Sequence, residues 1–305
     1  MKNKIIIFMA LLVLVMGQSF ASTGFNQILS MDNSDGKITA KSIEEAFNTS
    51  GLKVDVNNDM NSIFSKRYKK VHHKAYNLAI FTHHESVKKL MKTYPSIGLI
   101  TPLSMSIYMD EKNHINISTL SLEGMARVTK ISADNPDLKA YAKYLDEALH
   151  KALPKGKYLP KGESITMINE NLITSFSTEF DLEDGETYTD MKDGFKEEFE
   201  SEIGSVGFLV PKSYTFNSDE YDFYDTYSII RFNVIFPVSK SHPDAGSYAP
   251  FSLALYKKKG EDTVHIAFPS ISNWINDLDI SDKKSLVEIK KTQTMIVEIL
   301  EELTE

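Results

Sequence analysis

Apolar and polar residues alternate in two similar pairs of segments, 101–108 with 114–121 and 249–256 with 263–270. In each pair the leading segment opens with a proline, followed by a serine two residues later and a tyrosine six residues later. Such alternation is typical of strands with one buried face, and the polar turn between paired segments indicates a hairpin. The pattern therefore predicts two β-hairpins at matching places in a duplicated chain.

A helical period of apolar residues follows each hairpin. One helix is predicted to start at Asn135-Pro136, a cap followed by proline at the first helical position, and the other near Ser281. Shorter helices are expected from the capping-box spacing of Ser42 with Glu45, at Thr82 with Glu85, and along Met191–Ile203. A strand at 76–81 is paired by similarity with 227–232.

These elements predict an α+β protein made of two tandem repeats of a two-layer α/β sandwich. Each repeat would contain a mixed or antiparallel sheet with a β-hairpin, and would end in an amphipathic helix. The segment 154–163, with two prolines and two glycines, is the expected linker between a first repeat at 22–153 and a divergent second repeat at 164–305. Each repeat is expected to have its own core.

Residues 1–21 have the pattern of a secretory signal peptide. Two lysines precede an apolar run from Ile5 to Met16, and Ser19 and Ala21 supply the small residues that signal peptidase needs. We expect cleavage near Ala21 and a periplasmic or secreted mature protein. Since no later segment is long and apolar enough to span a membrane, no integral membrane segment is expected after cleavage.

Composition narrows the function classes. The 305 residues include no cysteine, which excludes disulfides, thiolate catalysis and cysteine-ligated metals. The formal net charge of −8 argues against nucleic acid as a partner. No Gly-x-Ser-x-Gly, His-Glu-x-x-His or phosphate-loop motif occurs, so the sequence leans away from an enzyme.

Four segments of the first repeat resemble the family known as domain of unknown function 302. They are Ser42-Ile-Glu-Glu-Ala-Phe, Gly51-Leu-Lys-Val-Asp-Val, Tyr76-Asn-Leu-Ala-Ile-Phe and Gly98-Leu-Ile-Thr-Pro-Leu-Ser-Met-Ser-Ile-Tyr-Met-Asp110, and the resemblance spans roughly residues 40–122. It implies a small α+β domain, sometimes found in tandem, with no agreed activity. The chain departs from the family pattern at Val56-Asn57-Asn58 and Thr82-His83-His84, and the second repeat is similar mainly through the internal repeat.

Histidine is the densest candidate for chemistry, with pairs at 72–73 and 83–84 on either side of the predicted strand 76–81. A strand of this length would hold the pairs about 20 Å apart, so they would not share one ion. His83 or His84 could still meet His114 or His265 and bind a transition metal or haem iron. The alternative interpretation is a solvated basic rim.

Charge is distributed unevenly. Residues 65–92 carry eight basic residues and one acid, and residues 179–225 carry fifteen acids and three lysines. The two stretches are expected to face each other, to face charged partners, or simply to face solvent. Lys69, Lys70 and Tyr76 of the basic stretch are the candidate ligand-binding residues. Acids at 219–225 alternate with aromatic residues, which predicts an edge strand with a polar face, or alternatively a calcium or sugar site.

The sequence therefore favours an exported, non-catalytic protein that binds a small molecule or an envelope protein, with the groove between the repeats as the expected site. Metal or haem handling through the histidines is the alternative. The cofactor, the ligand and the oligomeric state are not fixed by the sequence.

Overall fold

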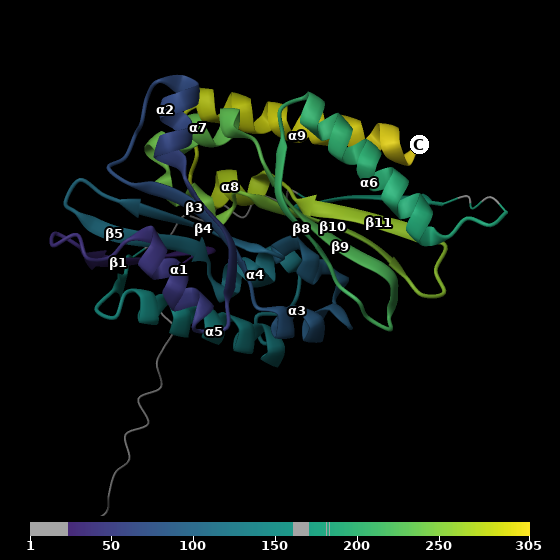
Figure 1. The fold of residues 1–305 in the computed structure, drawn as a ribbon, viewed down its shortest axis with the longest axis horizontal. Coiled ribbons are helices and arrows are strands. Elements are labelled where there is room, and N and C mark those ends of the chain that lie inside the picture. The colour runs from purple at the N-terminus through teal and green to yellow at the C-terminus, as the bar shows by residue number, and fades with distance from the viewer. Residues whose placement is uncertain (1–23, 161–170, 181, 183) are drawn as a thin grey trace, which may run out of the picture.

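The computed structural model describes residues 24–160, 171–180, 182 and 184–305. The predicted signal peptide and part of the predicted linker lie outside these residues. Two antiparallel sheets lie beside each other, with α1 and α5 along one side of the molecule and α6 and α9 along the opposite side (Figure 1). The predicted α+β class is confirmed.

The first half contributes the elements β1 (Asn26–Asp32), α1 (Ala40–Asn48), β2 (Lys53–Asp59), α2 (Met60–Tyr68), β3 (Tyr76–Thr82), α3 (His84–Met91), the 3₁₀ helix η1 (Pro95–Ile100), β4 (Leu103–Met109), β5 (His114–Leu120), α4 (Leu122–Thr129), α5 (Pro136–Ala152) and β6 (Lys157–Tyr158). The second half contributes β7 (Ile173–Glu179), α6 (Tyr188–Ser205), β8 (Leu209–Thr215), β9 (Tyr221–Ile230), α7 (Phe232–Ser241), the 3₁₀ helix η2 (Pro243–Ser247), β10 (Phe251–Lys258), β11 (Thr263–Pro269), α8 (Ser272–Asp277) and α9 (Lys283–Thr304).

The halves share one topology. The first sheet has the strand order β2-β3-β4-β5-β1-β6, and the second has β8-β9-β10-β11-β7 when read in the same direction. Apart from α2 and β6, every element of one half has a counterpart in the other. Strand β6 falls in the predicted linker and pairs with β1, so that part of the linker belongs to the first sheet.

Strand register fixes which residues correspond. Tyr76 on β3 pairs with Tyr108 on β4, and Tyr224 on β9 pairs with Tyr256 on β10. Tyr76 therefore corresponds to Tyr224, 148 residues later, and not to Tyr227, which the sequence comparison favoured. That comparison matched residues 76–81 with residues 227–232 by similarity, whereas backbone pairing with β10 sets the true register.

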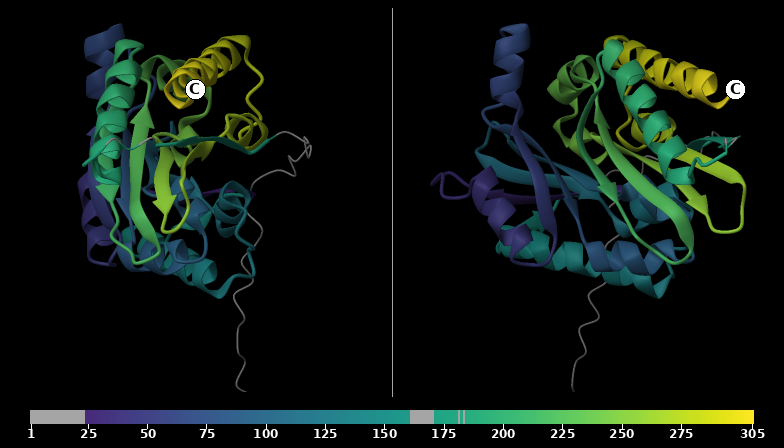
Figure 2. Two further views of the ribbon diagram at one scale, coloured as in Figure 1. Left: turned by 90° about the vertical axis from the view of Figure 1, so that its right-hand side faces the viewer. Right: turned by 45° about the vertical axis from the view of Figure 1, so that its right-hand side comes forward.

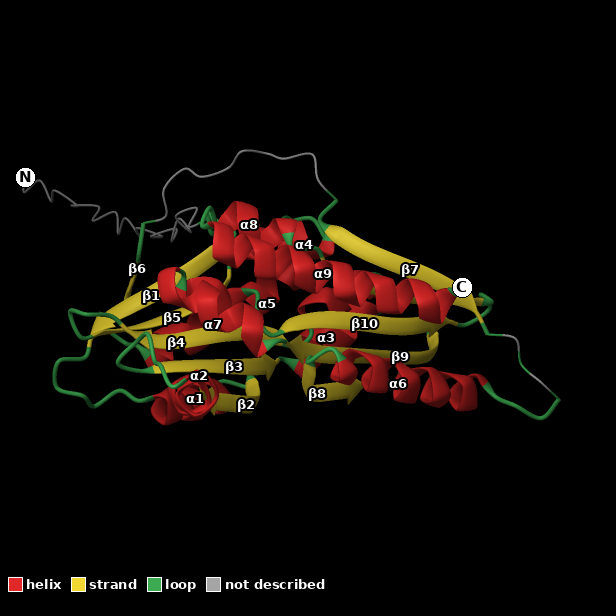
Figure 3. Ribbon diagram, turned by 90° about the horizontal axis from the view of Figure 1, so that it is seen from above, coloured by secondary structure: helices red, strands yellow, loops and turns green. Residues whose placement is uncertain are grey.

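The two halves dock reciprocally through their 3₁₀ helices. Helix η1 packs on β9 and β10, and η2 packs on β4 and β5. The two halves lie side by side in the right-hand view of Figure 2 and in the view from above in Figure 3. A Cβ on Gly98 would lie 2.6 Å from Ala254 Cβ, and a Cβ on Gly246 would lie 2.4 Å from Ser106 Cβ. Since these pairs are also 148 residues apart, the same close approach occurs twice with the halves exchanged.

Hydrogen bonds repeat this exchange. The Tyr221 hydroxyl donates to the Met91 carbonyl at 2.5 Å, and His73 Nε2 lies 2.6 Å from the Ser239 carbonyl. His73 corresponds to Tyr221, again 148 residues earlier. Because a carbonyl only accepts, His73 carries its proton on Nε2.

Buried apolar residues form two clusters, but these do not follow the two halves. The larger cluster joins the first sheet and its helices to second-half residues such as Tyr221, Tyr224 and Trp274. The smaller cluster lies in the second half and includes residues of α6, α9 and the second sheet. The expectation of one separate core per repeat is wrong, since each half completes the packing of the other.

Local helix starts differ from those predicted in two cases. Helix α1 is capped by Thr39, which forms the capping box with Ser42 in place of the predicted Ser42–Glu45 pair. Thr82 ends β3, and His83 caps α3. The cap at Asn135 of α5 is confirmed. Among the described residues, no helix is both long and apolar enough to cross a bilayer.

The docking geometry leads to a stability prediction. Gly246→Ala places a methyl group against the Ser106 backbone, where overpacking costs about 1–3 kcal/mol of unfolding free energy. Gly194→Ala in α6 is the matched control, because nothing lies within 4 Å of its Cβ and alanine favours a helix by up to about 1 kcal/mol. Urea unfolding of both variants should show opposite shifts, and equal stability would contradict reciprocal docking through this glycine.

Candidate functional site

The site lies between the halves, at the start of α3 and along one face of that helix. A cleft of about 790 Å³ is bounded by α3 and α5 of the first half and by the segment 217–220 of the second. The hydrogen bond from Tyr221 to the Met91 carbonyl joins these walls at the end of α3. The cleft is thus a product of the docking of the halves.

His83, directly before α3, lines this cleft. Its Nδ1 accepts a hydrogen bond from the Ser86 backbone N–H at 3.3 Å, which caps α3 and leaves the ring proton on Nε2. The centroid of the Tyr144 ring lies 4.5 Å from the centroid of the His83 ring. Burial lowers the pKa of His83, Glu85 opposes this shift, and the neighbouring His84 adds to it. His83 is therefore a neutral donor beside an exposed aromatic ring.

His84 lies on the other side of the α3 N-terminus, against the second half. Its ring contacts Tyr214 and Phe216, with centroids 6.1 and 5.8 Å away. Asp55 accepts hydrogen bonds from the Tyr214 hydroxyl and the Lys53 ammonium, both at 2.7 Å. Burial lowers the pKa of His84, although Asp55 opposes the shift. Burial raises the pKa of Tyr214, and its bond to Asp55 raises it further, so Tyr214 remains a donor.

Lysines line the α3 wall of the cleft. Lys89 pairs with Asp137 of α5 at 2.6 Å, whereas Lys88 and Lys92 form no ion pair with any residue that the structure describes. Two ammonium groups therefore remain available to a ligand carboxylate.

Acids line the opposite wall, from the second half. Ser218 donates to Glu220, and this bond, with smaller contributions that include Lys92, lowers the pKa of the Glu220 carboxyl. Asp219 completes the acidic side. The predicted meeting of the basic stretch with the acidic stretch occurs here, over the segments that line the cleft.

The predicted site residues do not form one cluster. Lys69 and Lys70 are exposed after α2, but Tyr76 is fully buried, with its ring stacked on Phe64. His114 binds Asp110 through Nδ1 at 3.0 Å, at the opposite end of the first sheet from His83 and His84. The structure therefore does not bring Tyr76 to the surface beside the two lysines, and a role of these three residues in ligand binding stays a prediction.

The histidines do not converge either. His72 packs on Phe236 of the second half and His73 bonds to Ser239, so this pair belongs to the docking interface. Within the described ranges, no group of three or more histidine and acidic side chains is arranged to hold a metal. The metal or haem alternative stays a prediction without a ligand set.

The predicted polar edge strand at 219–225 is wrong. Strand β9 lies between β10 and β8, and Asp225 on it is fully buried. Lys196 and Lys192 of α6 approach Asp225 Oδ2 at 3.3 and 3.7 Å. Asp225 therefore belongs to a buried ion network under α6, a role that a pattern within one strand does not reveal.

Comparisons with known proteins agree with the family resemblance. Residues 31–155 match the family described as domain of unknown function DUF302. A crystal structure of an uncharacterized conserved DUF302 protein from Bacillus stearothermophilus aligns with 11% identity and a TM-score of 0.36, covering 43% of this chain and 99% of that chain. No match was found among curated proteins. The resemblance found in the sequence is confirmed for the first half.

Stability should fall in mild acid because of four partly buried histidines. Burial lowers the pKa of His72, His73, His83 and His84 below the ordinary 6.5. Between about pH 5 and 7 the unfolded chain then binds more protons than the folded chain, so the stabilisation is present above pH 6.5 and is lost as pH falls through the lowered pKa values. We expect a smaller unfolding free energy at pH 5.5 than at pH 7.5 in urea titrations.

His73→Gln tests the cause, since the amide can still donate to Ser239 but takes up no proton. The variant should show a weaker pH dependence than the wild type. His150→Gln is the control, because His150 lies at the surface of α5. Identical pH profiles for the wild type and His73→Gln would contradict this explanation.

Proposed function

We propose that this protein, whose residues 31–155 match the DUF302 family, is an exported, non-catalytic binding protein that takes a small zwitterionic ligand in the cleft between its halves. The observation that carries the proposal is the opposition of a basic wall and an acidic wall in one cleft of about 790 Å³. A ligand with both charges, such as a short peptide or an amino acid, matches this arrangement.

Each part of the cleft has a defined role in the proposal. Lys88 and Lys92 bind the ligand carboxylate, and Asp219 with Glu220 binds its ammonium group. Tyr144 has an exposed side chain, and its ring packs against the body of the ligand beside His83. The two walls of opposite charge also give the cleft its specificity for zwitterions, because a ligand with only one charge leaves the charged side chains of one wall unpaired.

Binding of trialanine and its capped forms tests this function. Free trialanine should bind to the full mature chain more tightly than N-acetyl-trialanine or trialaninamide in calorimetric titrations. The double variant Lys88→Gln with Lys92→Gln and the variant Asp219→Asn should each weaken binding roughly threefold to tenfold, as expected for exposed charged contacts. Added salt should weaken it as well.

Lys143→Gln is the matched control, since it removes a lysine from the exposed side of α5 outside the cleft. It should leave the affinity unchanged. Equal affinity for free and capped peptides, or equal loss in the control and the cleft variants, would refute the zwitterion proposal.

Export is supported by the pattern of residues 1–21 and is tested separately. Protein recovered from expressing bacteria should have the mass of a chain that begins at Ser22. Replacing Ala21 with phenylalanine should block cleavage and retain the precursor mass, because signal peptidase needs a small residue there. A full-length mass for the wild-type protein would contradict export by this route.

A further inference from the structure

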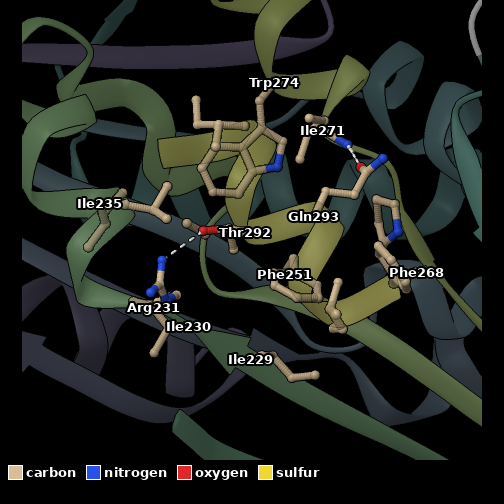
Figure 4. Close-up of a pocket in the computed structure, with 15 residues that line it drawn as sticks. Ile229, Ile230, Arg231, Ile235, Phe251, Phe268, Ile271, Trp274, Thr292 and Gln293 are labelled. Atoms are coloured by element: carbon tan, nitrogen blue, oxygen red, sulfur yellow. Dashed lines mark hydrogen bonds between the residues drawn. The ribbon is translucent and has the colours of Figure 1, made fainter. Parts of the chain in front are cut away.

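A second cavity lies wholly within the second half, between its sheet and the helices α7, α8 and α9 (Figure 4). It measures about 40 Å³. Its walls are mainly apolar and include Ile229, Ile235, Phe251, Phe268, Trp274 and Ile289. It is separate from the cleft between the halves, and shares no lining residue with it.

The polar side chains at this cavity are those of Arg231, Thr292 and Gln293, and two of them have N–H groups to spare. Arg231 donates through Nε to the Val206 carbonyl and through Nη1 to Thr292 Oγ1, at 3.3 and 3.2 Å. These bonds use two of the five N–H groups of a guanidinium. Gln293 Oε1 accepts from the Ile271 backbone at 2.7 Å, which leaves its amide N–H groups without a partner among the described residues. Figure 4 shows Arg231, Thr292, Gln293 and Trp274 around the same space.

The corresponding place in the first half has core side chains. Helices α5 and α9 are capped by Asn135 and Asp282, 147 residues apart, and four of the six buried residues of each helix coincide at this spacing. Thr292 thus stands where the first half has the fully buried Leu145. Arg231 precedes α7 at the position where His83 precedes α3, but its side chain makes no capping hydrogen bond. The fold is built in the first half without these donors, so they are not a requirement of the architecture.

The size of the cavity limits its ligand. A water needs roughly 10–15 Å³, so about 40 Å³ holds a group of a few atoms. Apolar walls with donors on one side suit a short alkyl chain that ends in a carboxylate. A guanidinium binds a carboxylate through charge-assisted, often paired hydrogen bonds.

We propose that this cavity binds a monocarboxylate of two to four carbons, with the carboxylate on Arg231 and Thr292 and the alkyl chain against Trp274 and Phe251. Glu288 competes for the same cation. Its carboxylate lies 3.8 Å from Arg231 Nη1 and its side chain is 32% exposed, so the pair is loose and open to solvent.

Trp274 gives a direct measurement, because it is the only tryptophan in the chain. Acetate, propionate and butyrate, added to the full mature protein at constant ionic strength against sodium chloride, should each change its fluorescence in a saturable way. Propanol and butanol should produce no saturable change at the same concentrations. Hexanoate should bind more weakly than butyrate because it exceeds the cavity.

Three variants make the test specific. Arg231→Met should weaken butyrate binding roughly tenfold to a hundredfold, the range for a hydrogen bond to a charged group. Thr292→Leu, which restores the first-half side chain, should fill the cavity and abolish the fluorescence response. Glu288→Gln should strengthen binding, because it removes the competing charge.

Lys290→Met is the matched control, since it removes one positive charge from the exposed side of the same helix and should not alter binding. If Arg231→Met fails to fold, Thr292→Leu and Glu288→Gln still test whether a carboxylate binds in this cavity. Alcohols that bind as tightly as carboxylates, weaker binding by Glu288→Gln, or no saturable response to any of the three acids would overturn the proposal. The trialanine titrations are independent of this result.

Discussion

The close approach of each 3₁₀ helix to the sheet of the other half is the constraint on which the rest of the structure depends. Gly98 and Gly246 allow it, because a Cβ at either position would lie at sub-contact distance from the facing strand. The approach brings His73 and Tyr221 to their carbonyl partners and merges first-half and second-half side chains into one apolar cluster. Since the cleft lies between the docked halves, its walls are positioned by these two glycines.

The sequence predicts elements well where the signal is local. Both hairpins and the helices ending each half follow from the period of apolar residues, and the cap at Asn135 follows from its neighbour Pro136. Errors appear where the answer depends on distant residues. Asp225 has the pattern of a polar edge strand, but β8 pairs outside β9 and α6 covers Asp225 with two lysines. No feature near Asp225 in the sequence distinguishes these environments.

The candidate site shows the same limit. The histidine pair at 83–84 is visible in the sequence, yet its surroundings come from Asp55, Tyr214 and Phe216, the last two more than 120 residues away. In the sequence, only the opposite charges of residues 65–92 and residues 179–225 indicated that these two parts of the chain meet. The length of β3 correctly places His72 and His73 at one end of the strand and His83 and His84 at the other, because a strand fixes distance directly. The docking of two halves does not follow from either half alone.

Reciprocal docking also creates two equivalent places with different chemistry. Gly51 and Gly207, both with positive φ, precede β2 and β8, so residues on these strands correspond at a spacing of 156. Around His84 the first place has Asp55 bonded to Tyr214. The second place has Phe232 and Pro211 at the corresponding positions, in an apolar cavity of about 290 Å³. At both places a glycine of a 3₁₀ helix, Gly98 or Gly246, lies close against a strand of the other half. Side chains at the starts of α3 and α7 therefore vary without disturbing the contact between the halves, and the chemistry of these two places is separable from the assembly of the fold.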